Sequence, residues 1–230
     1  MIQKSKVQIT GGLYGKLPGH GDFIQRQLPG SFVTPWDEWL QRAVYGSREL
    51  IGENWLDYYL TSPIWRFAFT AGVLDERSWA GVLVPSVDSV GRYFPLTMAS
   101  PIGDGADPFS IQARLADWFV ILAGLALEAL QNTLQADQLI ERFPVQCVSD
   151  FSAAAVANNR GAILASGEDG SEISCLYPTL LHRLYGRENS SYSLWWCPGS
   201  PQLAPTTLLS PSLPDPALYC TMLGAPAIQM

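Results

Sequence analysis

The sequence predicts an α/β fold: a single domain over residues 1–230, with a mixed, mostly antiparallel central sheet flanked by helices in a layered α/β/α arrangement. Three observations support this prediction. Alternating and apolar segments in the middle of the chain indicate neighbouring strands. Apolar stripes at helical spacing come before and after these strands. No internal repeat or break in composition marks a domain boundary.

The middle of the chain carries the clearest strand pattern. Over 64–71, aromatic residues alternate with smaller or polar ones, which is typical of a strand buried mainly on one face. A polar turn at 75–78 leads into an apolar segment at 79–84, and a further strand is expected over 93–99. Because the connections are short, these three strands are predicted to form an antiparallel meander.

The N-terminal part is expected to contain a strand over 7–13 and a helix that begins near Thr34. Thr34 would be the N-cap, Pro35 the first helical residue, and Asp37 would complete a capping box. Apolar residues then recur at helical spacing, namely Trp36, Trp39, Leu40, Ala43 and Val44. This stripe predicts one buried face. A shorter helix is expected over 54–60.

From residue 107 onward, four helices and one strand are expected, and the pattern is weaker after residue 145. Asp107 and Pro108 mark the start of the longest expected helix, with Asp107 as its cap and Pro108 at its first position. Its nearly continuous apolarity suggests burial on more than one side. Further elements are expected over 137–143 (helix), 177–185 (helix), 192–197 (strand) and 215–223 (helix).

Composition and charge argue against two classes of partner. The formal net charge is −7, and only 15% of the residues are charged whereas 47% are hydrophobic. Nucleic-acid binding requires a clustered basic surface, and adhesion to an anionic membrane also depends on basic residues. The longest apolar run, over 118–127, is too short to span a bilayer. We therefore expect no nucleic-acid partner and no direct membrane insertion.

The cysteines and the N-terminus bear on metal binding and location. The four cysteines include no C-x-x-C pair, so the close ligand spacing of zinc sites is absent. No signal peptide is recognised, because the first lysines are not followed by an apolar stretch of the required length. We expect a cytoplasmic protein with reduced thiols, no metal and no cofactor.

The segment 15–23 contains three glycines and one proline, which is typical of a shaped, irregular loop. It carries Lys16, His20 and Asp22. It lacks the Lys-Ser or Lys-Thr ending of a phosphate-binding P-loop, and Asp22 would repel phosphate. The residues therefore leave open a structural turn and a partner-binding loop, with nucleotide binding the weaker alternative.

A second loop, over 85–96, joins two expected core strands and carries Ser86, Asp88 and Arg92. Asp88 and Arg92 are four residues apart and would pair if the loop were helical. This loop is either a capped turn with a weak ion pair or, together with the first loop, one polar site at an edge of the sheet. The second interpretation predicts that five residues share one surface region, namely Lys16, His20, Asp22, Asp88 and Arg92.

Two adjacent tryptophans occupy the last expected strand. Neighbouring strand residues point to opposite faces, so one indole should enter the core while the other faces a helix layer or solvent. An exposed Trp196 would be a candidate anchor for a partner, because binding hot spots favour tryptophan.

The residues indicate no catalytic machinery. With two histidines in the chain, His20 would have to act as the base, with Ser86 or Ser89 as nucleophile. No Gly-x-Ser-x-Gly elbow is present, and His182 lies among leucines as an expected packing residue. We predict no catalytic residues. A hydrolase using His20 would require a serine hydroxyl within hydrogen-bond reach.

Four segments together resemble one family. They are residues 15–23, 36–40, 62–67 and 85–96. In combination they are similar to the TagF (ImpM-like) family of type VI secretion-associated proteins, with specific resemblance across residues 12 to about 100. Weaker similarity continues at 193–196 and 213–216.

This resemblance implies a cytoplasmic, non-enzymatic negative regulator that restrains type VI secretion after translation by binding the system's forkhead-associated scaffold protein. Some relatives carry a fused PP2C-type phosphatase domain, whose metal-binding aspartate motifs this chain lacks. The residues expected to bind the partner or form the polar site are Lys16, His20, Asp22, Ser86, Asp88, Arg92 and Trp196. The alternative is a small-molecule or nucleotide-sensing domain that uses Gly15 to Asp22 as a ligand pocket.

Overall fold

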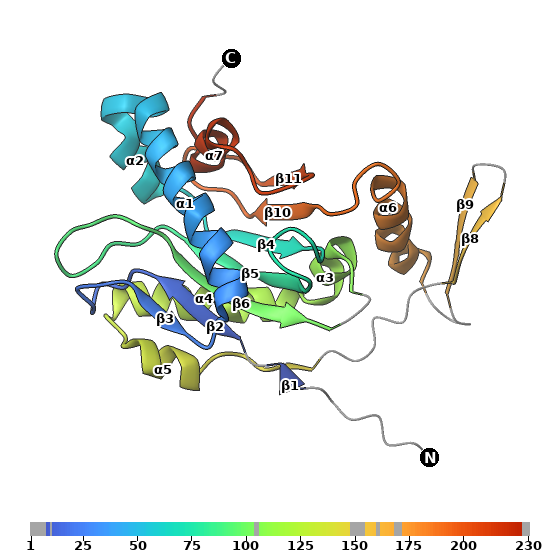
Figure 1. Cartoon of the computed structure of the whole chain (residues 1–230), viewed down its shortest axis with the longest axis horizontal. Helices are drawn as coiled ribbons and strands as arrows, with labels where there is room; N and C mark the ends of the chain where they lie inside the picture. Colours follow the sequence, from blue (N-terminus) through green and yellow to red (C-terminus); the bar gives the residue numbers. More distant parts are fainter. Residues whose placement is uncertain are drawn as a thin grey trace.

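A computed structural model describes residues 8–9, 11–103, 106–147, 155–159, 162–167 and 172–226. Its centre is a seven-stranded sheet in the order β11-β10-β4-β5-β6-β2-β3 (Figure 1). The strands are β2 (Gly12–Gly15), β3 (Ile24–Arg26), β4 (Trp65–Phe69), β5 (Ser78–Val84), β6 (Leu96–Ile102), β10 (Ser193–Cys197) and β11 (Thr206–Ser210). The predicted α/β class is confirmed. Every neighbouring pair in this sheet is antiparallel, so the described residues contain no parallel pair of the kind that a mixed sheet would include.

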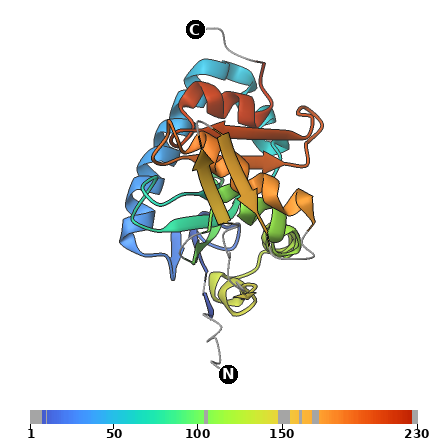
Figure 2. The same cartoon turned by 90° about the vertical axis from the view of Figure 1, so that its right-hand side faces the viewer.

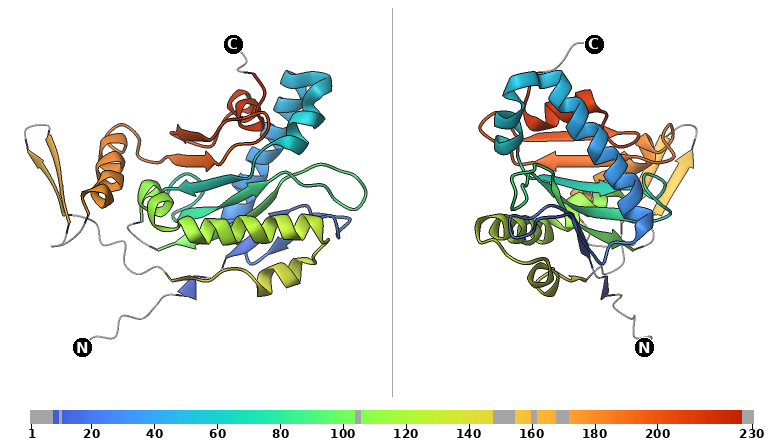
Figure 3. Two further views of the ribbon diagram at one scale, coloured as in Figure 1. Left: turned by 180° about the vertical axis from the view of Figure 1, so that it is seen from behind. Right: turned by 60° about the vertical axis from the view of Figure 1, so that its left-hand side comes forward.

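Helices cover both faces of the sheet, as the layered prediction requires (Figure 3). On one face lie α1 (Gly30–Ile51), α2 (Trp55–Thr61) and α7 (Pro216–Leu223), with the short 3-10 turn η1 (Gly52–Asn54) between the first two. On the other face lie α3 (Pro108–Arg114), α4 (Ala116–Gln131) and α5 (Ala136–Glu141). The predicted meander is confirmed as β4-β5-β6.

Much of the chain's aromatic content lies in the layer between α1 and the sheet. Trp36, Trp79 and Trp195 are almost completely buried there. The rings of Trp36 and Trp195 are nearly parallel, with centroids 6.1 Å apart. The predicted stripe on the first helix is confirmed, since all five of its members are buried. Aromatic pairs of this kind add stabilisation beyond the burial of area.

The start of α1 differs from the prediction. The helix begins at Gly30, directly after Pro29, so Thr34 is not its cap and Pro35 lies inside the helix. Phe32 is completely buried, which draws the preceding turn into the helix. Pro35 removes one helical N–H donor, but the acceptor it leaves belongs to Ser31, which is exposed to solvent.

The long helix expected after Asp107 is divided. Asp107 accepts a hydrogen bond from the Ser110 backbone N–H at 2.9 Å, which confirms it as the N-cap of α3. The backbone leaves helical geometry at Leu115, and α4 begins at Ala116. The longest helix is therefore α1, with 22 residues.

The remaining elements extend from one end of the molecule (Figures 1 and 2). They are η2 (Ile173–Leu176), α6 (Tyr177–Tyr185), β8 (Ala155–Asn159) and β9 (Ala162–Ser166), and a separate pair is formed by β1 (Gln8–Ile9) and β7 (Gln146–Cys147). The helix α6 packs on α3, and β9 packs on α6. None of the helices in the described segments is both long and apolar enough to cross a membrane.

Candidate functional site

The two loops predicted from the sequence leave the sheet at the same end. The first follows β2 and the second joins β5 to β6, and β6 pairs with both of these strands. Because both pairings are antiparallel, the C-terminal ends of β2 and β5 and the start of β6 meet at the same end of the sheet. Gly15 stands at this junction with φ +129°, and a Cβ there would lie 2.0 Å from the Pro95 carbonyl oxygen. Only glycine fits this close approach.

Asp88 is the centre of the site. One carboxylate oxygen accepts hydrogen bonds from Lys16 Nζ at 2.6 Å and from Arg92 Nε at 2.7 Å. The other accepts the backbone N–H groups of Val90 and Arg92 at 3.1 and 2.8 Å. The side chain of Asp88 is fully buried and that of Lys16 is 5% exposed. Burial by itself would raise the pKa of Asp88, but these four donors outweigh it and hold the pKa well below its usual range.

Ser86 joins the second loop to the first. Its hydroxyl donates to the Lys16 carbonyl oxygen at 2.7 Å. The phenol of Tyr59 on α2 accepts from the Ser86 N–H and donates to the Ser86 carbonyl oxygen, each at 2.9 Å. Burial raises the pKa of Tyr59 well above its usual value, so its hydroxyl keeps the proton that it donates. These bonds fix the backbone from which Asp88 projects.

Arg92 closes the loops on their outer side. Its guanidinium donates to the Gly21 carbonyl oxygen and approaches the Asp22 carboxylate at 3.5 Å. The Asp88–Arg92 pair forms as predicted, but in a tight turn rather than a helix. Gly91 has φ +86° and donates its N–H to the Asp88 carbonyl. The pairing is therefore set by turn geometry.

His20 takes part through its backbone. Its N–H donates to the Leu17 carbonyl, and its own carbonyl accepts the Ser89 N–H, both at 3.0 Å. The imidazole Nδ1 is buried and has no hydrogen-bond partner within the described residues. No hydrogen bond joins His20 to a serine hydroxyl in that part of the chain, which is the contact that a hydrolase would require.

The five residues predicted to cluster do lie together, connected by hydrogen bonds across the two loops to which Ser86 also contributes, but Lys16 and Asp88 are buried rather than at the surface. The cluster has two levels. The lower level consists of the buried residues Lys16, Ser86 and Asp88, which hold the two loops together. The Asp22 side chain is almost fully exposed, and that of Arg92 is half exposed.

Two apolar residues of the exposed level were not singled out in the sequence. Phe23 is 47% exposed and Val90 is 67% exposed. The Phe23 ring packs against Phe94 with centroids 4.8 Å apart and stacks on Tyr14, while Lys16 Nζ lies 5.0 Å from its centre. The only sequence signal was an aromatic residue ending a glycine-rich loop. We refer to Asp22, Phe23, Val90 and Arg92 as the loop surface.

Trp196 does not belong to this cluster: of the two predicted alternatives for the second indole, a helix layer or solvent, the structure shows the helix layer. Trp195 is fully buried against α1, and Trp196 is 8% exposed on the opposite face, where its ring packs edge-on against Phe119 of α4. The two do face opposite sides, as the strand alternation predicts. Because helices cover both faces of β10, neither ring is free to act as an anchor.

The family model that describes the TagF N-terminal domain, type VI secretion system-associated, matches residues 12–144. The chain belongs to this TagF family. The match covers more than half of the chain and includes both loops, α1 and the central meander. No curated protein matches the chain.

A solved structure extends the similarity beyond the family model. This TagF-family chain is similar to PA0076 from Pseudomonas aeruginosa PAO1, with a TM-score of 0.77 and 30% sequence identity. The alignment covers 96% of this chain and 98% of that one. The resemblance expected from the four sequence segments is thus confirmed, and a type VI secretion-associated role follows from the family.

The structure also bears on whether the TagF protein could bind a charged ligand or a metal ion. The Lys16 ammonium is buried against Asp88, so it does not present its charge to a ligand. Within the described residues, no group of three or more His, Cys, Asp or Glu side chains could hold a metal ion. Cys175, Cys197 and Cys220 are free thiols. The loop surface can make apolar and charged contacts with a macromolecule.

Proposed function

We propose that this TagF-family protein is a non-enzymatic, post-translational negative regulator of type VI secretion that acts in the bacterial cytoplasm. It binds the forkhead-associated scaffold protein of the system, and the loop surface forms the contact. The observation that carries this proposal is the two-level cluster, in which a buried Lys16–Asp88 pair fixes the loops beneath an exposed Phe23 and Val90.

The cluster favours a protein partner over a small ligand for two reasons. First, its buried cation and carboxylate are already paired with each other, so little unpaired charge is left to bind a ligand. Second, the exposed level combines an aromatic ring and an aliphatic side chain with Asp22 and Arg92 at its rim. Interfaces commonly place apolar anchors within such a polar rim. Because the loops are already fixed, little entropy is lost on binding.

The direct test measures binding of the forkhead-associated scaffold to the purified full chain by calorimetry. The double variant F23S/V90S removes the apolar part of the loop surface and should weaken binding at least tenfold. The matched control is Tyr45→Ser on α1, since Tyr45 is also exposed, at 68%. Binding that is unchanged in F23S/V90S, with its fold intact by circular dichroism, would place the interface elsewhere.

The regulatory part is tested in a strain that secretes through the system. Raising the level of the wild-type chain should reduce secretion, and F23S/V90S should restore it. Repression should scale with the ratio of this protein to the scaffold, because a binding regulator acts by mass action. Full repression at a small fraction of the scaffold concentration would contradict the non-enzymatic mechanism.

A further inference from the structure

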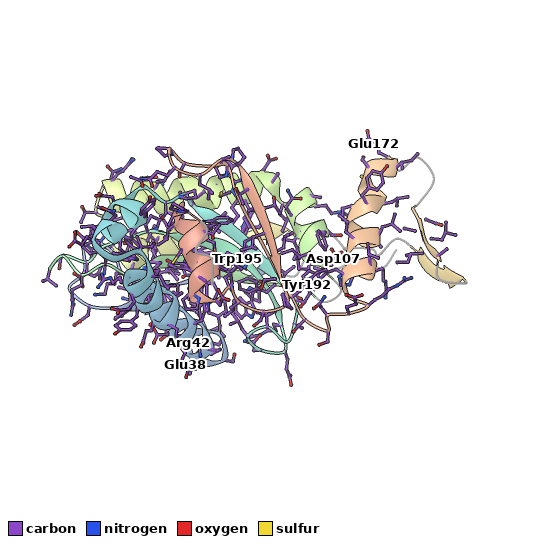
Figure 4. All side chains as sticks on the ribbon, turned by 90° about the horizontal axis from the view of Figure 1, so that it is seen from above. Glu38, Arg42, Asp107, Glu172, Tyr192 and Trp195 are labelled. Atoms are coloured by element: carbon purple, nitrogen blue, oxygen red, sulfur yellow. The ribbon has the colours of Figure 1, made fainter. Side chains whose placement is uncertain are left out.

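A second polar site lies at the end of α6, and all of its described lining residues except Thr70 are outside the family-model match. A pocket of about 310 Å³ is lined by seven residues between His182 and Tyr192 together with Thr70, which directly follows β4. Of the eight lining residues that belong to the described part of the chain, His182, Arg183 and Arg187 are basic and none is acidic. This is notable in a chain with a formal net charge of −7. Figure 4 shows Tyr192, which lines the pocket, between the sheet and α6.

These basic side chains are not needed to cap the helix. Cationic side chains at a helix C-terminus often donate hydrogen bonds to its unpaired carbonyl groups. Here the backbone N–H groups of the following turn already bond these carbonyl groups. Gly186 donates to the carbonyl oxygen of His182, Arg187 to that of Leu184 and Glu188 to that of Tyr185. The Arg183 guanidinium has no hydrogen bond or ion pair within the described segments, and its side chain is exposed at the pocket. Its charge is therefore available to a ligand.

Tyr192, in the wall of the pocket, orients the imidazole of His182. The Tyr192 hydroxyl lies 2.7 Å from His182 Nδ1. Burial, followed by the negative charge of Asp107, raises the pKa of Tyr192, so the phenol keeps its proton and can donate it to Nδ1. When Nδ1 accepts this hydrogen bond, the other ring nitrogen, Nε2, carries the imidazole hydrogen and acts as a donor. Asp107 is itself engaged by the N–H and hydroxyl of Ser110.

We propose that this pocket binds a phosphate group, either inorganic phosphate or the monoester of a small molecule. The guanidinium of Arg183 offers the planar pair of donors that matches two phosphate oxygens. His182 Nε2 and the Ser190 hydroxyl supply further donors from the same pocket. Its volume is at the lower end for ligand sites, which suits a phosphate with a few attached carbons. This site is separate from the loop surface, so either can fail without the other.

The test titrates the full chain with inorganic phosphate and, separately, with glycerol 3-phosphate, at constant ionic strength, by calorimetry. Saturable binding of one or both supports the site, and the tighter of the two identifies the source of the phosphate. Arg183→Gln should weaken this binding about tenfold or more. The matched control Arg42→Gln, which removes one exposed charge from α1, should leave it unchanged.

Two outcomes would overturn the proposal. One is the absence of saturable binding of either probe to the wild-type chain. The other is an equal loss of affinity in Arg183→Gln and Arg42→Gln, which would indicate general screening by net charge. A second variant, Tyr192→Phe, removes the hydroxyl that orients His182 and should also weaken binding. If it binds as wild type while Arg183→Gln does not, the orienting role of Tyr192 is wrong.

Discussion

The two polar sites use similar side chains in opposite ways. At the loops, the carboxylate of Asp88 is surrounded by Lys16 and Arg92, and every charge beneath the surface is paired. At the end of α6, Arg183 and His182 line an open pocket in which none of the described lining residues is acidic. The difference shows that a cation contributes to stability where the fold itself supplies its partner. Where the fold does not, the cation is available for recognition.

The largest effect that tests this comparison is expected from Asp88→Asn. This change leaves the Lys16 ammonium buried without a counter-charge, and breaking a buried ion pair in this way costs about 3–5 kcal/mol. Urea denaturation should show this loss in the free energy of unfolding. The double variant K16M/D88L, which removes both charges, should lose clearly less than the sum of the single variants Lys16→Met and Asp88→Leu. A loss under about 1 kcal/mol in Asp88→Asn would contradict the anchoring role.

The pH dependence should be the next largest effect. The folded pKa of Asp88 lies below that of the unfolded chain, which is about 3.9. The stabilisation is therefore complete above about pH 4 and is lost as the pH falls through the folded value. Over that window this group contributes a slope of up to about 1.4 kcal/mol per pH unit. The difference in unfolding free energy between wild type and Asp88→Asn should shrink from pH 6 to pH 3. A constant difference would show that Asp88 titrates normally.

A smaller effect is expected from Ser86→Ala. It removes the hydroxyl that donates to the Lys16 carbonyl but leaves both bonds between Tyr59 and the Ser86 backbone in place. Loss of one buried hydrogen bond costs about 1 kcal/mol. Thermal or urea unfolding measures this loss, and Ser89→Ala, at an exposed serine of the same loop, is the control with an expected effect near zero. Equal effects of the two would remove Ser86 from the network.

The smallest effect on stability is expected from Arg183→Gln. Because its guanidinium has no partner within the described residues, unfolding should change by at most about 0.5 kcal/mol without ligand. With saturating phosphate, the wild type should gain stability and the variant should gain less. A large loss without ligand would show that Arg183 is structural, and the contrast between the two sites would then disappear.

Local patterns in the sequence were sufficient for much of the fold. The meander, the stripe on α1, the Asp107 cap and the bounds of α6 each depend on neighbouring residues, and all four are confirmed. The errors concern long-range packing. The start of α1 is set by the burial of Phe32 against the ring of Trp79, and the weak strand β11 forms because β10 pairs with it. Neither contact has a local signature.

For the candidate site, the sequence by itself identified the two loops, the residues that join them and the family to which they belong. Only the tertiary structure decided which of those residues are buried supports and which are exposed. Lys16 and Asp88 are 72 positions apart, and they meet because β2 and β5 both pair with β6. The exposure of Phe23 and the burial of Trp196 likewise depend on which surfaces the helices cover. Charge and hydrophobicity are properties of the chain, whereas their partners in space are fixed only when the sheet assembles.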